Sequence, residues 1–152
     1  MPGDPAPNEP RPRRPGPPRN LRWDAFGAVA LGGVLGAAAR YGVGLAWPAP
    51  PDSFPWATFT VNVTGCALIG VLMGVLELID AHPLIRPFAG TGILGGYTTF
   101  SSYAIDIERL VAAGAPRTGL LYLVATPLAA IAAVWVTAVL TRAAVGRHVR
   151  CD

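Results

Sequence analysis

Hydrophobic residues in this chain form four long apolar stretches that are separated by short turns. The stretches run from about 25 to 47, 56 to 78, 84 to 111 and 119 to 140. Each is close to the roughly 20 residues that an α-helix needs to cross the hydrocarbon core of a membrane. The turns between them contain proline, glycine or histidine, as short connections do. The pattern predicts an all-α integral membrane protein with four transmembrane helices in one domain, residues 23–143.

The two ends of the chain differ from this apolar region. Residues 1–22 alternate proline with arginine and cannot bury a core, so we expect a disordered tail. Residues 144–152 form a second, shorter tail. An even number of spans puts both tails on one side of the membrane. The opposite side carries only Arg40, Arg109 and Arg117, so the positive-inside rule predicts that both termini are cytoplasmic.

Composition supports the membrane class and narrows the range of functions. Hydrophobic residues make up 52% of the chain and charged residues 14%, which is too apolar for a soluble domain of this size. Cys66 lies inside an apolar stretch and Cys151 near the end, so we expect neither a disulfide nor a zinc site. The sequence has no recognisable nucleophile and base pair, metal cluster or phosphate loop. We therefore expect no enzymatic activity.

The third apolar stretch contains a polar run that should interrupt its helix. Residues 95–102 read GGYTTFSS, a series of glycines, hydroxyls and β-branched residues. We expect a break near residues 95–99. Broken backbone is tolerated in a bilayer only where it is buried in protein or lines a cavity, and its freed carbonyls and amides can then hold ions. The alternative is a helix that is only bent, because its hydroxyls bond to the preceding turn.

Other polar side chains share helix faces at the i, i+4 spacing. Thr58 and Asn62 do so in the second stretch, and Tyr122 and Thr126 do so in the fourth, just before Pro127. The Asn62 amide could donate to an anion or hold two helices together. Tyr122 could belong to a polar track or to the aromatic belt at the membrane surface.

Aromatic and charged residues near these positions also have two interpretations each. Phe100 and Tyr103 are three apart and should lie side by side, either as packing or as ring edges that face an anion. Arg40 could reach the membrane surface, cap a helix or attract anions into a vestibule. Asp106 could form a local ion pair with Arg109.

Glycines four residues apart predict close helix contacts inside the membrane. The pairs are Gly32 with Gly36, Gly70 with Gly74, and Gly92 with Gly96. Four helices alone enclose little space, so transport would require an oligomer. A dimer is the simplest closed assembly.

Three segments of the chain resemble a known family of membrane proteins. They are GGVLGAAARYGVG at 32–44, WATFTVNVTGCALIG at 56–70 and GTGILGGYTTFSSYAID at 90–106. Their order and spacing resemble the small fluoride channels called Fluc or CrcB proteins. The resemblance implies a fluoride-selective channel in the cell membrane that passively exports fluoride and lowers its cytoplasmic concentration.

The resemblance also implies an assembly and an ion site. Members of the family form antiparallel dimers with a structural sodium ion at the centre. By motif, the ligands here would be the backbone carbonyls of Gly95 and Thr98 from each subunit. The resemblance casts Asn62 as a fluoride hydrogen-bond donor, Phe100 as an edge-on aromatic residue of the fluoride pathway, and Arg40 as a vestibule residue.

The remaining positions match the family to different degrees. Thr58, Tyr122 and Thr126 correspond to its hydroxyl-lined path. Asp106 stands where many relatives have a glutamate, so its role is open. Tyr103 takes the place of the family's second phenylalanine, and the fourth stretch continues with apolar residues where relatives often keep serine or threonine. One of the two pathways of a dimer could therefore be weakened or lost.

Several alternatives stay open from the sequence. The strong arginine bias, together with Tyr103 and the apolar end of the fourth stretch, suggests an alternative to a homodimer of dual topology, namely a heterodimer with a related, oppositely inserted chain. A small proton-coupled multidrug exporter would need a buried acid in its first span, and none follows Asp24 there. A non-transporting membrane subunit would leave Asn62 and the GGYTTFSS run unexplained.

Overall fold

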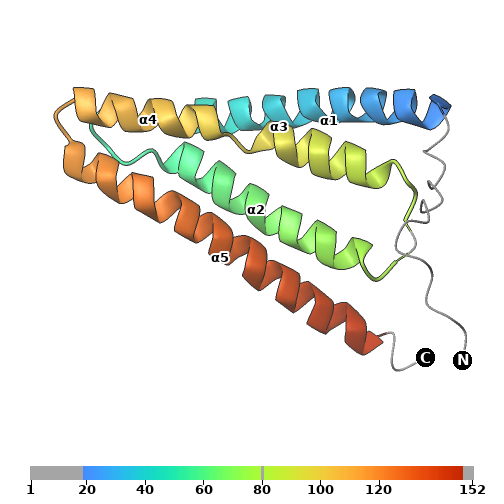
Figure 1. The fold of residues 1–152 in the computed structure, drawn as a ribbon. Helices are drawn as coiled ribbons and strands as arrows, with labels where there is room; N and C mark the ends of the chain where they lie inside the picture. Colours follow the sequence, from blue (N-terminus) through green and yellow to red (C-terminus); the bar gives the residue numbers. More distant parts are fainter. Residues whose placement is uncertain (1–18, 80, 149–152) are drawn as a thin grey trace, which may run out of the picture.

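The computed structural model describes residues 19–79 and 81–148, and all of the regular secondary structure in these ranges is helical. Most of the first tail, residues 1–18, and the last four residues of the second lie outside the described part. In order, the elements are α1 (Arg19–Ala46), α2 (Trp56–Leu76), the π-helical segment η1 (Arg86–Leu94), α3 (Gly95–Tyr97), α4 (Phe100–Ala112) and α5 (Pro116–His148) (Figure 1).

Three of these helices contain segments long and apolar enough to cross a membrane. They are Trp23–Ala46, Trp56–Leu76 and Pro116–Ala144, with hydropathies of 1.4, 2.0 and 2.2. The third predicted span is present as η1, α3 and α4 in series, so no single piece of it reaches the length of a span. The structure therefore supports three of the four predicted spans as membrane-spanning candidates, and the remaining one, divided among shorter helices, stays a prediction.

Helix ends agree with the predicted spans at some points and extend beyond them at others. α2 begins at Trp56, as expected, whereas α1 begins at Arg19 and α5 continues to His148. Hydropathy marks the part of a helix that suits hydrocarbon, but intrahelical hydrogen bonds continue past it. The 33 residues of α5 span about 50 Å, longer than a hydrocarbon core of about 30 Å.

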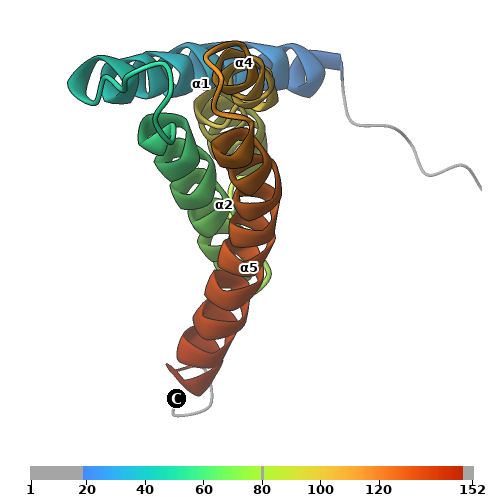
Figure 2. The same cartoon turned by 90° about the vertical axis from the view of Figure 1, so that its left-hand side faces the viewer.

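The helices alternate in direction, so the start of α1 and the end of α5 lie at the same end of the molecule (Figure 1). α1 packs on η1 and α3, while α2 packs along α5. Seen from the side, α1 runs across the direction of α2 and α5 (Figure 2). The protomer is therefore an open arrangement of two helix pairs, joined through α2 and the broken segment.

Glycines allow both pairs to approach closely, as the sequence predicts. A Cβ atom on Gly36 would collide with the backbone of Ile93 and Tyr97, so α1 can lie against the broken segment only without a side chain there. A Cβ atom on Gly70 would collide with the backbone of Val134 in α5. Every member of the three predicted glycine pairs contacts another element in this way.

A glycine also makes the turn between α4 and α5. Gly114 has a φ of 78°, in the left-handed region that glycine adopts without strain. The amide of Gly114 donates to the Val111 carbonyl and that of Ala115 to the Leu110 carbonyl, which is the Schellman pattern of a helix end. The turn sends α5 back antiparallel to α4.

The buried core is small and lies near the α4 to α5 turn. Leu110 and Tyr122 are 1% and 0% exposed, and Phe54 and Phe59 pack on them. By contrast, only 6% of the most apolar window of α5 is buried and 11% of that of α1. Most of the outer surface is therefore apolar and suited to lipid or to another protein chain.

Candidate functional site

The helix break lies at two consecutive extended residues. Thr98 has φ −71° and ψ 153°, and Thr99 has φ −148° and ψ 123°. These angles end α3 at Tyr97 and let α4 begin at Phe100, within the predicted range of residues 95–99. The alternative of a continuous, bent helix does not occur.

The Asn62 side chain of α2 clamps the broken backbone. Its Nδ2 donates to the Thr99 carbonyl at 3.0 Å, and the Thr99 amide donates to its Oδ1 at 2.8 Å. Both residues are buried, with 9% and 8% of their surfaces exposed. Asn62 thus joins two helical segments, and its second Nδ2 hydrogen stays available as a donor. Asn62 can therefore hold two helical segments together and still have a hydrogen to donate to an anion.

The clamp and a neighbouring cap release two backbone carbonyls. In a continuous helix the Thr99 amide would donate to the Gly95 carbonyl, and the Ser102 amide to the Thr98 carbonyl. Here the Thr99 amide donates to Asn62, and the Ser102 amide donates to the Thr99 hydroxyl at 3.1 Å. Gly95 and Thr98, the two residues expected to supply carbonyl ligands, therefore both lose their helical donors.

Thr99 is the residue that the sequence reading missed. Its hydroxyl caps α4 and also lies within hydrogen-bonding distance of the Ser101 and Ser102 hydroxyls, at 3.2 and 3.1 Å. Threonine is a preferred residue just before a helix, so the placement of Thr99 ahead of a helical stretch was an available signal. One residue thus supplies both the peptide that Asn62 holds and the cap that starts α4.

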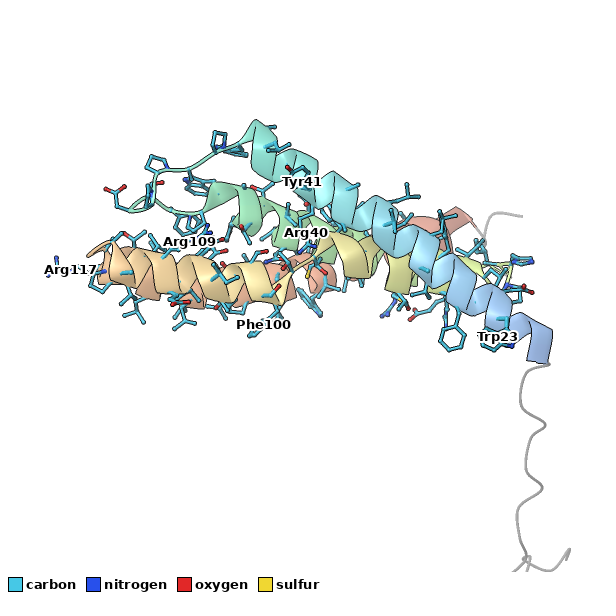
Figure 3. All side chains as sticks on the ribbon, turned by 90° about the horizontal axis from the view of Figure 1, so that it is seen from above. Trp23, Arg40, Tyr41, Phe100, Arg109 and Arg117 are labelled. Carbon is cyan, nitrogen blue, oxygen red and sulfur yellow. The ribbon has the colours of Figure 1, made fainter. Side chains whose placement is uncertain are left out.

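A cavity of about 490 Å³ lies between α1, α2 and the start of α4, and we call it the Arg40 cavity. Arg40, Thr58, Thr99 and Ser102 supply its polar lining. Arg40 lies on the α1 side of α4, whereas Phe100 lies on the opposite side (Figure 3). The structure thus brings the predicted vestibule residue together with Thr58 but away from Phe100.

A groove of about 490 Å³ lies on the other side of the break, and we call it the Phe100 groove. Its lining includes most of the predicted pathway residues. The predicted pathway residues in the lining are Asn62, Phe100, Tyr103 and Thr126. The rest of the lining consists of Cys66, Thr98, Thr99, Leu123, Pro127 and Ala130. Thr99 lines both spaces, so the clamped peptide separates the cavity from the groove.

The two aromatic residues after the break lie side by side, as predicted. The ring centroids of Phe100 and Tyr103 are 5.7 Å apart, at an interplanar angle of 48°. Phe100 is 80% exposed in the protomer, whereas Tyr103 is 8% exposed. The Tyr103 hydroxyl donates to the Leu123 carbonyl at 2.6 Å. The hydroxyl by which Tyr103 differs from the phenylalanine expected at this position therefore binds to α5.

Three buried polar atoms between α4 and α5 have no hydrogen-bond partner in the described part of the chain. They are Asp106 Oδ2, Tyr122 OH and Thr126 Oγ1. Tyr122 is fully buried, so it is not a belt residue facing lipid. The Thr58 and Thr126 hydroxyls lie near the Tyr122 hydroxyl but outside hydrogen-bonding geometry. Buried groups of this kind call for a ligand, a water molecule or a functional role.

The expected ion pair between Asp106 and Arg109 does not form. The ion pair among the described residues joins Arg142 to Glu77, with 2.7 Å between Nε and Oε2. Arg109 is exposed, whereas Asp106 is half-buried and turns one carboxylate oxygen into the protein. That prediction was wrong because a spacing of three on a helix permits a contact without requiring it.

These features define a multi-pass, all-helical membrane protein in which two cavities meet at a clamped helix break. The chain belongs to the family of CrcB-like proteins (Camphor Resistance, CrcB), whose model matches residues 27–138.

Several relatives carry more specific names. The chain is 61% identical to fluoride-specific ion channel FluC 1 of Streptomyces coelicolor over 111 residues, 72% of each chain. It is 61% identical over 99 residues to FluC 2 of Streptomyces avermitilis, covering 64% of this chain and 63% of the relative. FluC 3 of the same organism is 41% identical over 131 residues, covering 86% of this chain and 64% of the relative.

Proposed function

We propose that this protein is a fluoride-selective channel that lets fluoride leave the cell passively. The observation that carries the proposal is the helix break held by Asn62, because it lies between the Arg40 cavity and the Phe100 groove. A broken helix of this kind places polar backbone at membrane depth only where it serves an ion path or is covered by protein. The names of the relatives specify the ion as fluoride.

The chemistry of the two linings favours an anion over a cation. Among the residues that the structure describes, Arg40 is the charged member of these linings, and neither lining contains a carboxylate. The groove adds the free Asn62 hydrogen, the unpartnered Thr126 hydroxyl and the ring edges of Phe100 and Tyr103, all of which are positive toward an anion. A proton-coupled exporter of cations would need an acid here. The lining therefore supports anion conduction against that alternative.

A structural sodium ion is part of the proposal. The carbonyls of Gly95 and Thr98 lose their helical donors, and carbonyl oxygens are hard ligands that suit an alkali cation. Two carbonyls are too few for a complete site, so a second subunit would supply two more. A fixed cation beside the break would lower the electrostatic cost of an anion passing nearby.

The proposed assembly is an antiparallel dimer, because one protomer leaves the Phe100 groove open and Phe100 exposed. A heterodimer with a related chain is the second form that we consider. It is supported by the uneven arginine distribution and by the two differently numbered FluC proteins of Streptomyces avermitilis. In either form, we propose cytoplasmic termini for this chain in the cell membrane.

The direct test is fluoride efflux from liposomes that contain only this purified chain, followed with a fluoride electrode beside chloride efflux. We expect fluoride release without chloride release, and loss of release in Asn62→Ala. Thr64→Ala is the matched control, because Thr64 lies on the same helix and bonds mainly to the Thr60 carbonyl of its own turn. A silent chain that a related second chain activates would establish the heterodimer, and silence with every partner would refute the channel.

A further inference from the structure

Pro127 leaves one backbone carbonyl of α5 without its helical donor. Proline has no amide hydrogen, so the carbonyl four residues earlier, that of Leu123, loses its intrahelical bond. Leu123 and Pro127 both line the Phe100 groove. Without a substitute donor, a bare carbonyl oxygen would therefore stand beside the proposed path of an anion.

The Tyr103 hydroxyl supplies that donor. It reaches the Leu123 carbonyl at 2.6 Å from α4, and the Tyr103 ring also lines the groove. A tyrosine hydroxyl has a single hydrogen to donate, so this contact occupies it. The ring is held between Tyr122 and Phe100, at centroid distances of 5.2 and 5.7 Å.

We propose that Tyr103 and Pro127 form one functional pair, in which the Tyr103 hydroxyl covers the carbonyl that Pro127 frees. The pair would keep a negative oxygen from facing a passing anion while leaving the positive ring edge in the groove. Tyr103 then acts as a pathway residue through its hydroxyl as well as its ring, and Pro127 is a positioning residue. This inference rests on the proposed function.

The pairing predicts that one substitution rescues the other. Tyr103→Phe keeps the ring but uncovers the Leu123 carbonyl, so we expect fluoride efflux to fall about fivefold, the factor that corresponds to about 1 kcal/mol. Pro127→Ala restores an amide hydrogen at residue 127, which can cover the same carbonyl. Efflux is therefore compared within each background. Tyr103→Phe should lower efflux in the original chain, but the double variant should release fluoride as fast as Pro127→Ala alone.

Efflux is measured per folded protein in liposomes for the original chain, the two single variants and the double variant. Thermal unfolding of the same four proteins provides a second, independent comparison. Tyr97→Phe is the matched control, because its hydroxyl bonds to the Thr64 side chain and not to a carbonyl freed by proline. Equal efflux of Tyr103→Phe and the original chain, or slower efflux of the double variant than of Pro127→Ala alone, would overturn the inference. An original chain that stays silent both alone and with a related second chain would overturn the proposed function instead. The thermal unfolding of the four proteins would still decide whether the Tyr103 hydroxyl and the residue 127 amide replace each other.

Discussion

Replacing Asn62 by alanine removes the two hydrogen bonds with which the Asn62 side chain of α2 holds the helix break. The Thr99 amide and carbonyl would lose bonds of 2.8 and 3.0 Å at a buried site. The helix could instead become continuous, with the Thr99 amide donating to the Gly95 carbonyl. Either result changes the backbone between the Arg40 cavity and the Phe100 groove.

The expected loss of stability follows from these two bonds. Hydrogen bonds between membrane helices contribute about 0.6 kcal/mol each on average and at most about 1.7 kcal/mol. The loss of the acceptor for the buried Thr99 amide lies toward the upper limit, because a buried amide without an acceptor keeps its full desolvation cost. We therefore expect Asn62→Ala to lose about 2 to 3 kcal/mol of unfolding free energy, a large share of the roughly 5 to 15 kcal/mol of a typical folded protein.

Two assays separate stability from conduction. Thermal unfolding in detergent reports the loss of stability, and liposome efflux, normalised to folded protein, reports conduction. We expect Asn62→Ala to fold at reduced temperature without releasing fluoride, and Thr64→Ala to resemble the original chain in both assays. A variant that lacks the Asn62 amide yet matches the original in stability and efflux would refute both the clamp and its role in the path.

Three further outcomes are expected from other parts of the molecule. Gly36→Ala should destabilise the protein by about 1 to 3 kcal/mol, because its Cβ meets backbone of Ile93, whereas Gly27→Ala, which meets nothing, should be neutral in thermal unfolding. Glu77→Gln should cost less than about 1 kcal/mol, and less in high salt, since its ion pair with Arg142 is half exposed. Replacing sodium with a large organic cation on both membrane sides should abolish fluoride efflux; unchanged efflux would refute the proposed cation.

The sequence predicts the features that depend on local pattern. Apolar length identifies the spans, and glycine spacing identifies the contact faces of α1 and α2. The polar run at residues 95–102 identifies a helix break, because its glycines, hydroxyls and β-branched residues weaken a continuous helix. Each of these signals lies within one stretch of about 20 residues.

Features that depend on contacts between distant residues could not be predicted in the same way. Asn62 and Thr99 meet across 37 positions, and only the packing of α2 against the break decides that the amide is used there. The bond from Tyr103 to Leu123 requires the antiparallel return of α5. The missing pair of Asp106 with Arg109 shows the converse, since tertiary packing can override a favourable local spacing.

The geometry of the break also argues for a ligand from outside the protomer. Two side-chain acceptors, Asn62 Oδ1 and Thr99 Oγ1, take the amides that would otherwise satisfy the Gly95 and Thr98 carbonyls. In hydrocarbon, a carbonyl without a donor costs several kcal/mol, so an arrangement that removes both donors is stable only if something else binds the oxygens. Water or a cation can do so, and the open Phe100 groove beside them leaves room for a second subunit. The stability of the break and the completion of the assembly are therefore expected to depend on each other.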